Sequence, residues 1–289
     1  MKILVTGGAG FIGTNLIKRL IEDGHKVSSL DNYSTGFKRN EQEGCQYFDI
    51  DISEISDYSF FMDKPDVIFH LAALARIQPS LKKPTKTIHN NFISTLNVLE
   101  YARNTKSKVI YSGSSTVHHG LYGSPYAWSK YGGEQLCELY SKVYNVSTAI
   151  ARFYNVYGKH QLEDGEYATI LGIFERQFRN NEPFTIVGDG EQRRDFTHID
   201  DIVDALVLIS KKEFKGEKFE LGRGKNYSIN EIADMFDKNY QRITLPQRSG
   251  EYPFTLADNT FVKNKLGWSP KKRVSDYIKR LDINKKDEK

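Results

Sequence analysis

The chain has 289 residues, enough for one large domain or two modest ones, and its 41 basic and 37 acidic side chains leave a net charge of only +4. The basic residues are scattered, which argues against a nucleic-acid-binding surface. No apolar run approaches the ~20 residues that would span a bilayer. Two cysteines, Cys45 and Cys137, lack metal-site spacing, and the N-terminus enters a strand without a signal peptide. We therefore expect a cytoplasmic protein with no metal site and no nucleic-acid or membrane partner.

The N-terminal stretch predicts a phosphate-binding turn. Lys2–Thr6 is a short apolar run typical of a buried strand, and Gly7, Gly10 and Gly13 follow in the order G-x-x-G-x-x-G. Glycines let the chain turn sharply and let a phosphate approach the backbone. The helix expected over Phe11–Glu22 would point its free N–H groups and positive dipole end at that phosphate. Alone, such a glycine pattern is weak evidence, because a tight turn that binds nothing has the same pattern.

The second predicted strand supplies the missing context. Lys26–Leu30 is apolar and is followed by Asp31, 18 residues after Gly13. Dinucleotide-binding folds place an acidic residue about 20 residues on, where it binds the adenosine ribose hydroxyls. An acid there repels a 2′-phosphate, and no basic residue follows until Lys38. The pattern favours NAD over NADP.

Further strands are predicted at 46–50, 66–71, 108–112 and 147–153, with a helix over 87–104. Strands that alternate with helices indicate an α/β fold with a doubly wound parallel sheet, whose ligands bind beyond the carboxyl ends of the strands. At Asp49 two interpretations stay open, an acceptor for the adenine amino group or a loop carboxylate. The residues assigned to the NAD site are Gly7, Gly10, Phe11, Ile12, Gly13, Asp31, Asn32, Ser34, Thr35, Gly36, Asp49, Ile50, Leu71, Ala72, Ala73, Asn90 and Ser112.

A serine-rich strand end and a Tyr–Lys pair predict the catalytic centre. Ser112–Thr116 leaves the strand at 108–112, and Tyr126 and Lys130 follow four residues apart on a helix expected over 124–144. Positions i and i+4 share a helix face. A lysine ammonium near the phenol is expected to lower the pKa of Tyr126 from its reference of ~10, which would suit a general base. A tyrosine and a lysine four residues apart usually lie on the solvent-exposed face of a helix. Here they follow a serine-rich strand end in a chain with a dinucleotide-binding pattern, which favours a catalytic role.

With these motifs, the chain resembles the extended short-chain dehydrogenases/reductases of the NAD-dependent epimerase/dehydratase group. The resemblance covers about residues 1–281. Its motifs are TGGAGFIG (6–13), DNYSTG (31–36), HLAA (70–73), YSGSSTV (111–117), SPYAWSK (124–130), RFYNVYG (152–158), GDGEQRRDFTHIDD (188–201) and LGW-P (266–270). It implies a Rossmann-type NAD-binding domain over 1–153 and a smaller C-terminal α/β domain for the nucleotide sugar over 154–289, with some elements packing back on the first.

The resemblance also implies roles for individual residues. Ser114, Tyr126 and Lys130 match the catalytic serine, base and lysine of the family, and Lys130 also holds the nicotinamide ribose. Tyr154 matches a residue beside the nicotinamide. The residues that match substrate contacts are Ser114, Thr116, Tyr126, Asn155, Arg194 and Arg248. Asn155 and Arg194 correspond to contacts with the diphosphate of the substrate, and Arg248 to a phosphate or ribose contact; for Asn155 a role as a turn former stays open.

Two departures from the family pattern bear on the reaction. The usual V-Y-G after the serine loop is replaced by Val117-His118-His119-Gly120, which puts the loop geometry in question. Dehydratases of the group carry an Asp-Glu pair, and decarboxylases a Glu, where this chain has Ser115 and Thr116. Without a carboxyl group there, removal and return of hydride at one carbon is the remaining chemistry.

We therefore expect an NAD-dependent 4-epimerase of a nucleotide sugar, with a UDP-hexose or its N-acetyl or uronic acid form as partner. The alternatives are a dehydratase, reductase or decarboxylase of the same family, and a non-catalytic NAD-binding sensor on the same fold. Family resemblance further implies a homodimer through the helices near 87–104 and 124–144. Its apolar side chains Phe92, Leu96, Leu136 and Leu139 suit either that interface or the core.

Overall fold

A seven-stranded sheet forms the centre of the molecule in the computed structural model, which describes residues 1–55 and 64–287. The strand order is β10-β6-β5-β4-β1-β2-β3, and every neighbouring pair is parallel. The strands are β1 (Lys2–Thr6), β2 (Lys26–Asp31), β3 (Cys45–Asp49), β4 (Val67–His70), β5 (Lys108–Ser114), β6 (Thr148–Phe153) and β10 (Lys215–Leu221). The predicted doubly wound parallel sheet is confirmed, and the order reverses between β1 and β4, where such sheets bind ligands.

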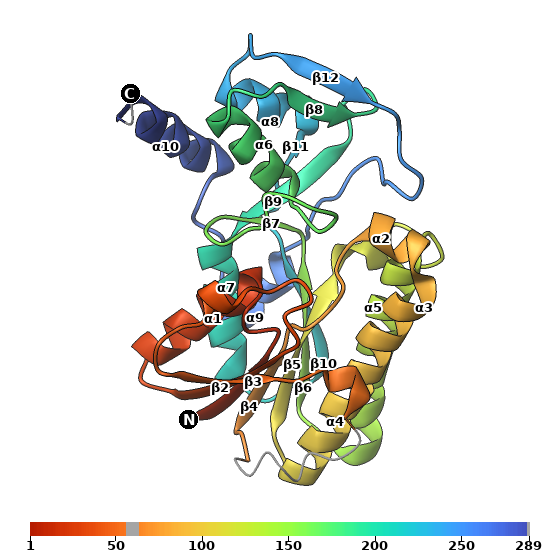
Figure 1. Ribbon diagram of the computed structural model, residues 1–289. Coiled ribbons are helices and arrows are strands. Elements are labelled where there is room, and N and C mark those ends of the chain that lie inside the picture. Colours follow the sequence, from red (N-terminus) through yellow and green to blue (C-terminus); the bar gives the residue numbers. More distant parts are fainter. Residues whose placement is uncertain (56–63, 288–289) are drawn as a thin grey trace.

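Helices cover both faces of this sheet (Figure 1). On one face lie α1 (Phe11–Glu22) and α7 (Ile199–Ser210), which contact each other, and on the other lie α4 (Ser94–Thr105) and α5 (Pro125–Tyr144). The strands between them are buried on both sides, which explains why they read as continuous apolar runs.

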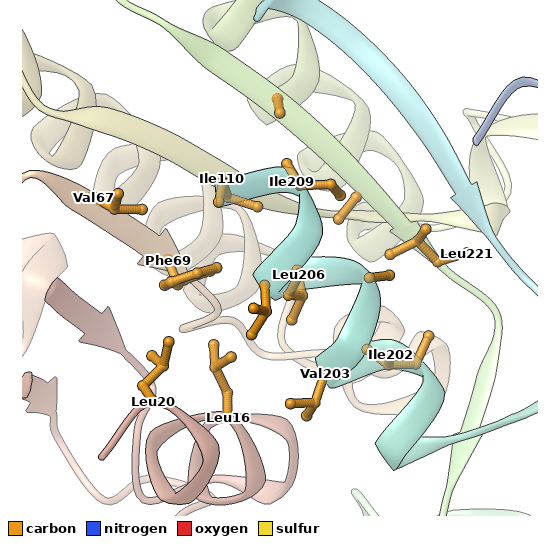
Figure 2. Packing of buried hydrophobic residues seen from close by; sticks show 14 of the residues in the cluster. Leu16, Leu20, Val67, Phe69, Ile110, Ile202, Val203, Leu206, Ile209 and Leu221 are labelled. Carbon is orange, nitrogen blue, oxygen red and sulfur yellow. The ribbon is translucent and has the colours of Figure 1, made fainter. Parts of the chain in front are cut away.

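Two elements from the second half of the chain complete this layer. Strand β10 pairs with β6 at the sheet edge. Figure 2 shows Val203 and Leu206 of α7 on the side of Leu16 and Leu20 of α1, with Ile202 on the opposite side of the helix, toward Leu221 of β10. Both elements follow residue 153, so the large layer is built from two separate parts of the sequence.

A smaller part of the molecule lies beyond the carboxyl ends of the strands (Figure 1). Its own apolar cluster includes Phe174, Phe178 and Phe184. Its elements are α6 (Ile170–Arg179), α8 (Ile229–Phe236), α10 (Val274–Asp287), a parallel pair of β8 (Phe184–Val187) and β12 (Arg242–Leu245), and a sheet of β11 (Asn226–Ser228), β9 (Arg193–His198) and β7 (Asn155–Tyr157). The α9 helix (Thr260–Leu266) packs beside β10.

The helix expected over 87–104 is interrupted. It consists of α3 (Pro84–Ile88), a π turn at His89–Ile93, and α4, and it is preceded by the short α2 (Ile77–Lys82). Within the π turn, the Asn91 side chain accepts a hydrogen bond from the Leu74 N–H at 2.8 Å and donates to the Leu74 carbonyl at 3.2 Å. π turns inside helices are frequent at functional sites, and this one fixes the chain just after β4.

Packing of α7 on the sheet predicts a stability effect. Leu206 is fully buried in the cluster between α1 and β4. We expect Leu206→Ala to lower the free energy of unfolding by about 2–5 kcal/mol, because it removes apolar contacts and leaves a cavity. Denaturant unfolding would measure this.

The matched control is Leu256→Ala, since Leu256 is 49% exposed. It should change stability by less than about 0.5 kcal/mol. Equal losses in the two variants would contradict the packing role of α7.

Candidate active site

A cavity of about 490 Å³ lies where the carboxyl ends of the strands meet the smaller part of the molecule. Its walls come from the turn after β1, the ends of β2, β4 and β5, the start of α5, and segments on either side of β7 and β9. Residues distant in the sequence therefore converge on one crevice, at the edge that the sheet topology predicts.

The turn after β1 requires glycine at two positions. Gly7 has φ +72°, and a Cβ there would lie 2.8 Å from the Ala72 nitrogen at the end of β4. At Gly13 a Cβ would lie 2.2 Å from the Gly7 carbonyl oxygen. Gly10 caps α1 with extended backbone and no side-chain hydrogen bond. The first N–H groups of α1 thus face the cavity without a side-chain cap, which suits a phosphate.

Asp31 closes the other side of this turn. Its carboxylate accepts hydrogen bonds from the N–H groups of Ala9 and Tyr33, both at 2.8 Å. Burial raises the pKa of Asp31, and these two hydrogen bonds oppose that shift. The carboxylate is therefore fixed in place while it lines the cavity, as expected of a group that binds ribose hydroxyls.

Most residues assigned to the cofactor from sequence line this cavity. Those that do are Gly7, Gly10, Phe11, Ile12, Gly13, Asp31, Asn32, Ser34, Thr35, Ile50, Leu71, Ala72, Ala73, Asn90, Ser112, Tyr126, Lys130 and Tyr154. Gly36 and Asp49 lie outside the lining. A Cβ on Gly36 would meet the Ala9 backbone, so its role is close packing, and the exposed Asp49 carboxylate lies 4.0 Å from Lys38.

The start of α5 places Tyr126 and Lys130, the two helix residues assigned to catalysis from the sequence, at the cavity. Ser124 caps the helix by accepting the Ala127 N–H at 3.1 Å, and Pro125 occupies its first turn. The Tyr126 hydroxyl donates to Ser114 Oγ at 3.3 Å. Thr116 also donates to Ser114 Oγ, at 3.0 Å.

The lysine of the pair has a different partner from the one expected. Lys130 Nζ donates to Ser112 Oγ at 3.2 Å and lies 4.3 Å from the centre of the Tyr111 ring. Burial lowers the pKa of Lys130 to about 7. Burial also raises the pKa of Tyr126, and the opposing influences are the Ser114 hydrogen bond and the charge of Arg76. The expectation that Lys130 lowers the pKa of Tyr126 is not met in this structure, because burial dominates.

The second half of the chain contributes polar groups at the opposite wall. Asn155 Nδ2 lies 3.4 Å from Thr255 Oγ1. Arg194 forms a 3.0 Å ion pair with Glu251 and donates to the Tyr252 carbonyl at 2.8 Å. Arg248 lines the cavity from an exposed position. The structure thus brings both arginines to the cavity that holds Tyr126.

The altered loop at Val117–Gly120 packs beside the cavity. The His118 ring nitrogen lies 2.9 Å from Glu220, whose other carboxylate oxygen accepts the Tyr154 hydroxyl at 2.8 Å. The His119 ring lies 5.3 Å from the ring of Tyr252, which lines the cavity. The two histidines therefore attach this loop to cavity-wall residues on other elements.

Arg76 is a cavity residue that the sequence did not indicate. It follows β4 by six residues and immediately precedes α2, and the cavity also includes Tyr167 and Ala168 from the loop before α6. Arg76 contacts this loop only because the loop lies close to α2 in the folded chain, where the Ala168 carbonyl accepts a hydrogen bond from Arg76 Nε at 3.3 Å. In the sequence, a single basic residue after a strand does not indicate a position in a ligand cavity.

The described residues contain neither a membrane-spanning helix nor a cluster of metal-binding side chains. None of the helices in residues 1–55 and 64–287 is long and apolar enough to cross a membrane. Within the same ranges, no cluster of three or more His, Cys, Asp or Glu residues is placed to hold a metal ion.

Comparisons with known proteins agree with this geometry. The model of the NAD dependent epimerase/dehydratase family matches residues 3–222. A UDP-glucose 4-epimerase of Mycolicibacterium smegmatis is 32% identical, with 96% of each chain covered. A UDP-N-acetyl-alpha-D-glucosaminuronate decarboxylase of Bacillus cytotoxicus is 31% identical over 80% of this chain and 78% of its own. The structure of UDP-glucuronic acid 4-epimerase from Bacillus cereus, in complex with UDP-glucuronic acid and NAD, superposes with a TM-score of 0.90 at 30% identity and full coverage of both chains.

The charge of Asp31 predicts a cofactor preference. We expect Asp31→Asn to keep the shape of the side chain but lose the repulsion of a 2′-phosphate, so that the ratio of the NADP and NAD dissociation constants falls about tenfold or more. Titration of cofactor-stripped protein with each dinucleotide would measure this ratio. Asp49→Asn is the control at the end of the neighbouring strand, and it should leave the ratio unchanged. An unaltered ratio in Asp31→Asn would contradict the assignment.

Burial of Lys130 predicts a pH-dependent stability. The pKa of Lys130 is about 7 in the fold against 10.5 for the free side chain, so between these values the unfolded chain binds more protons. The free energy of unfolding should therefore rise with pH across this window. We expect the stability of Lys130→Met relative to the wild type to be highest below about pH 7 and to decline toward about pH 10.

Thermal unfolding of the cofactor-free proteins at several pH values tests this. Lys142→Met on the same helix is the control, because the Lys142 side chain is 73% exposed. A difference between Lys130→Met and the wild type that stays constant with pH would refute the effect of burial.

Proposed function

Because the chain belongs to the NAD-dependent epimerase/dehydratase family, we propose that it is a nucleotide-sugar 4-epimerase that acts on a UDP-hexose or a derivative of one. The observation that carries the proposal is the pair of Tyr126 and Ser114, joined at 3.3 Å inside the cavity. Among the described lining residues, no carboxylate without a hydrogen-bonding or ionic partner is available as a second acid or base.

The acidic side chains of the cavity support epimerisation over dehydration or decarboxylation. Among the described residues the lining contains three, Asp31, Glu166 and Glu251. Asp31 is held by two backbone N–H groups, Glu166 lies 2.8 Å from Lys82, and Glu251 lies 3.0 Å from Arg194. Ser115 and Thr116 carry no carboxyl group. Elimination of water needs an additional acid or base, whereas inversion of one carbinol needs one proton carrier.

The cofactor residues fit NAD. The two glycines that admit no Cβ, the uncapped start of α1 and the fixed Asp31 carboxylate suit a diphosphate and a ribose diol. NAD, when bound, supplies the hydride acceptor and donor at the sugar C4. Tyr126 takes the proton of the 4-hydroxyl and later returns it, while Ser114 holds the same oxygen through a hydrogen bond. Lys130 beside Ser112 is placed to bind the nicotinamide ribose.

Retention of the oxidised sugar is the other requirement. Arg194 and Arg248, with Asn155, are assigned to the diphosphate, which a guanidinium binds well. Anchoring the diphosphate leaves the sugar free to turn and present its other face to the same hydride. The neighbouring Glu251 holds Arg194 in position.

A direct test is proton NMR of the purified protein mixed with UDP- and GDP-sugars without added NAD. A C4-inverted product is expected, because hydride leaves and returns in each turnover. Tyr126→Phe should abolish turnover and retain bound cofactor. Tyr122→Phe is the control, since Tyr122 is 91% exposed and lies outside the cavity lining. Full activity in Tyr126→Phe, or a keto or pentose product from the wild type, would overturn the proposal.

A further inference from the structure

Arg76 is a cation in the cavity to which the reaction outlined above assigns no contact with the cofactor or the substrate. It occupies the cap position of α2 with extended backbone, φ −149° and ψ 144°, and its side chain is partly buried among the cavity residues. No motif of the chain assigns it a role.

The guanidinium of Arg76 hydrogen-bonds to backbone carbonyls. Its Nε donates to the Ala168 carbonyl at 3.3 Å and one terminal nitrogen donates to the Ala75 carbonyl at 3.0 Å. Within the described part of the chain, no carboxylate forms an ion pair with it. By contrast, Arg152 pairs with Glu134 and Glu220, and Arg194 pairs with Glu251.

An arginine in such surroundings remains charged and has donors to spare. Burial lowers the pKa of Arg76, but a guanidinium keeps its proton throughout the physiological range. A charge withdrawn from water without a partner is costly. Two backbone carbonyls offset part of that cost, and the planar group can still bind an anion through two parallel hydrogen bonds.

The position of Arg76 points to the sugar. Arg76, Tyr126 and Tyr167 line the same cavity, and the proposed function places Tyr126 at the sugar C4 hydroxyl. The arginines assigned to the diphosphate come from other elements, Arg194 from β9 and Arg248 from the segment after β12. The anion that Arg76 meets should therefore be carried by the sugar ring.

The backbone that carries Arg76 is held before any ligand arrives. The Asn91 side chain bonds both backbone groups of Leu74, and its amide also donates to Ser129 Oγ of α5 at 3.0 Å. The loop at Ala168 accepts the Arg76 Nε. The side chain is thus attached to two parts of the cavity wall, which reduces the ordering cost of binding.

We propose that Arg76 binds a carboxylate on the sugar, so that the substrate is an acidic nucleotide sugar, such as a hexuronic acid, in preference to a neutral hexose. This inference rests on the proposed function for the position of the sugar. It names a specificity-determining residue and a substrate class for the same site.

The test compares dissociation constants measured by calorimetry on the NAD-loaded protein for UDP-glucuronate, UDP-glucose and UDP. Wild-type protein should bind UDP-glucuronate about tenfold or more tightly than UDP-glucose. Arg76→Met keeps the apolar stem and should remove this preference, with little change for UDP. Arg103→Met is the control, because it removes an exposed guanidinium outside the cavity lining, and it should leave all three constants unchanged.

Two results would overturn the inference: equal affinity of the wild type for acidic and neutral sugars, or an equal loss of UDP and UDP-glucuronate binding in Arg76→Met, which would place the diphosphate at Arg76.

UDP-N-acetylmuramate, whose carboxylate is on the C3 ether, shows which ring position carries the carboxylate that is bound. These constants need no turnover, so they are separable from the proposed function. Inversion of neutral sugars alone would refute only the inference, and absence of inversion with every sugar would refute only the epimerase.

Discussion

The close approach of two backbone segments at the centre of the sheet is the constraint on which the site depends. Gly7 lies against Ala72, and Gly13 lies against the Gly7 carbonyl, with no room for a Cβ at either glycine. The strands β1 and β4 are neighbours where the strand order reverses. The crevice lies beside this contact, next to the start of α1. The glycine turn after β1, the Asp31 carboxylate and the start of α5 all lie around this crevice.

The cavity combines burial with a small number of fixed charges. Burial makes Lys130 easier to deprotonate and Tyr126 harder to deprotonate, so the pair does not work through a simple contact between ammonium and phenol. Instead the Ser114 hydroxyl and the Arg76 charge act on the phenol. Acidic side chains in the lining are engaged by backbone or basic groups. Among the described residues of the cavity, Tyr126 is thus the side chain to which we assign proton transfer, and reversible inversion at one carbon needs one such group.

Local patterns were sufficient for much of this fold because each depends on neighbours in the chain. The apolar run Lys2–Thr6 formed β1 at the predicted residues, and Phe11–Glu22 formed α1. The short strands β7, β9, β11 and β12 and the helices α2 and α9 were not predicted, since they have few residues and depend on pairing across the chain. The helix over 87–104 was predicted without its π turn, whose asparagine is bonded to the chain after β4.

The sequence by itself determined the parallel sheet and the glycine turn after β1, because strand–helix alternation and glycine spacing are local features. The i, i+4 spacing likewise placed Tyr126 and Lys130 on one turn of helix, whereas the hydrogen bond between Ser114 of β5 and Tyr126 of α5 joins two separate elements. Tertiary structure decided what depends on distant segments. It placed α7 beside α1, left Gly36 and Asp49 outside the cavity, and directed Lys130 toward Ser112. It also gave Arg76 a partly buried position in which no carboxylate of residues 1–55 or 64–287 forms an ion pair with it. The burial of a side chain and the charges around it depend on residues that are distant in the sequence, so a local sequence pattern does not predict them.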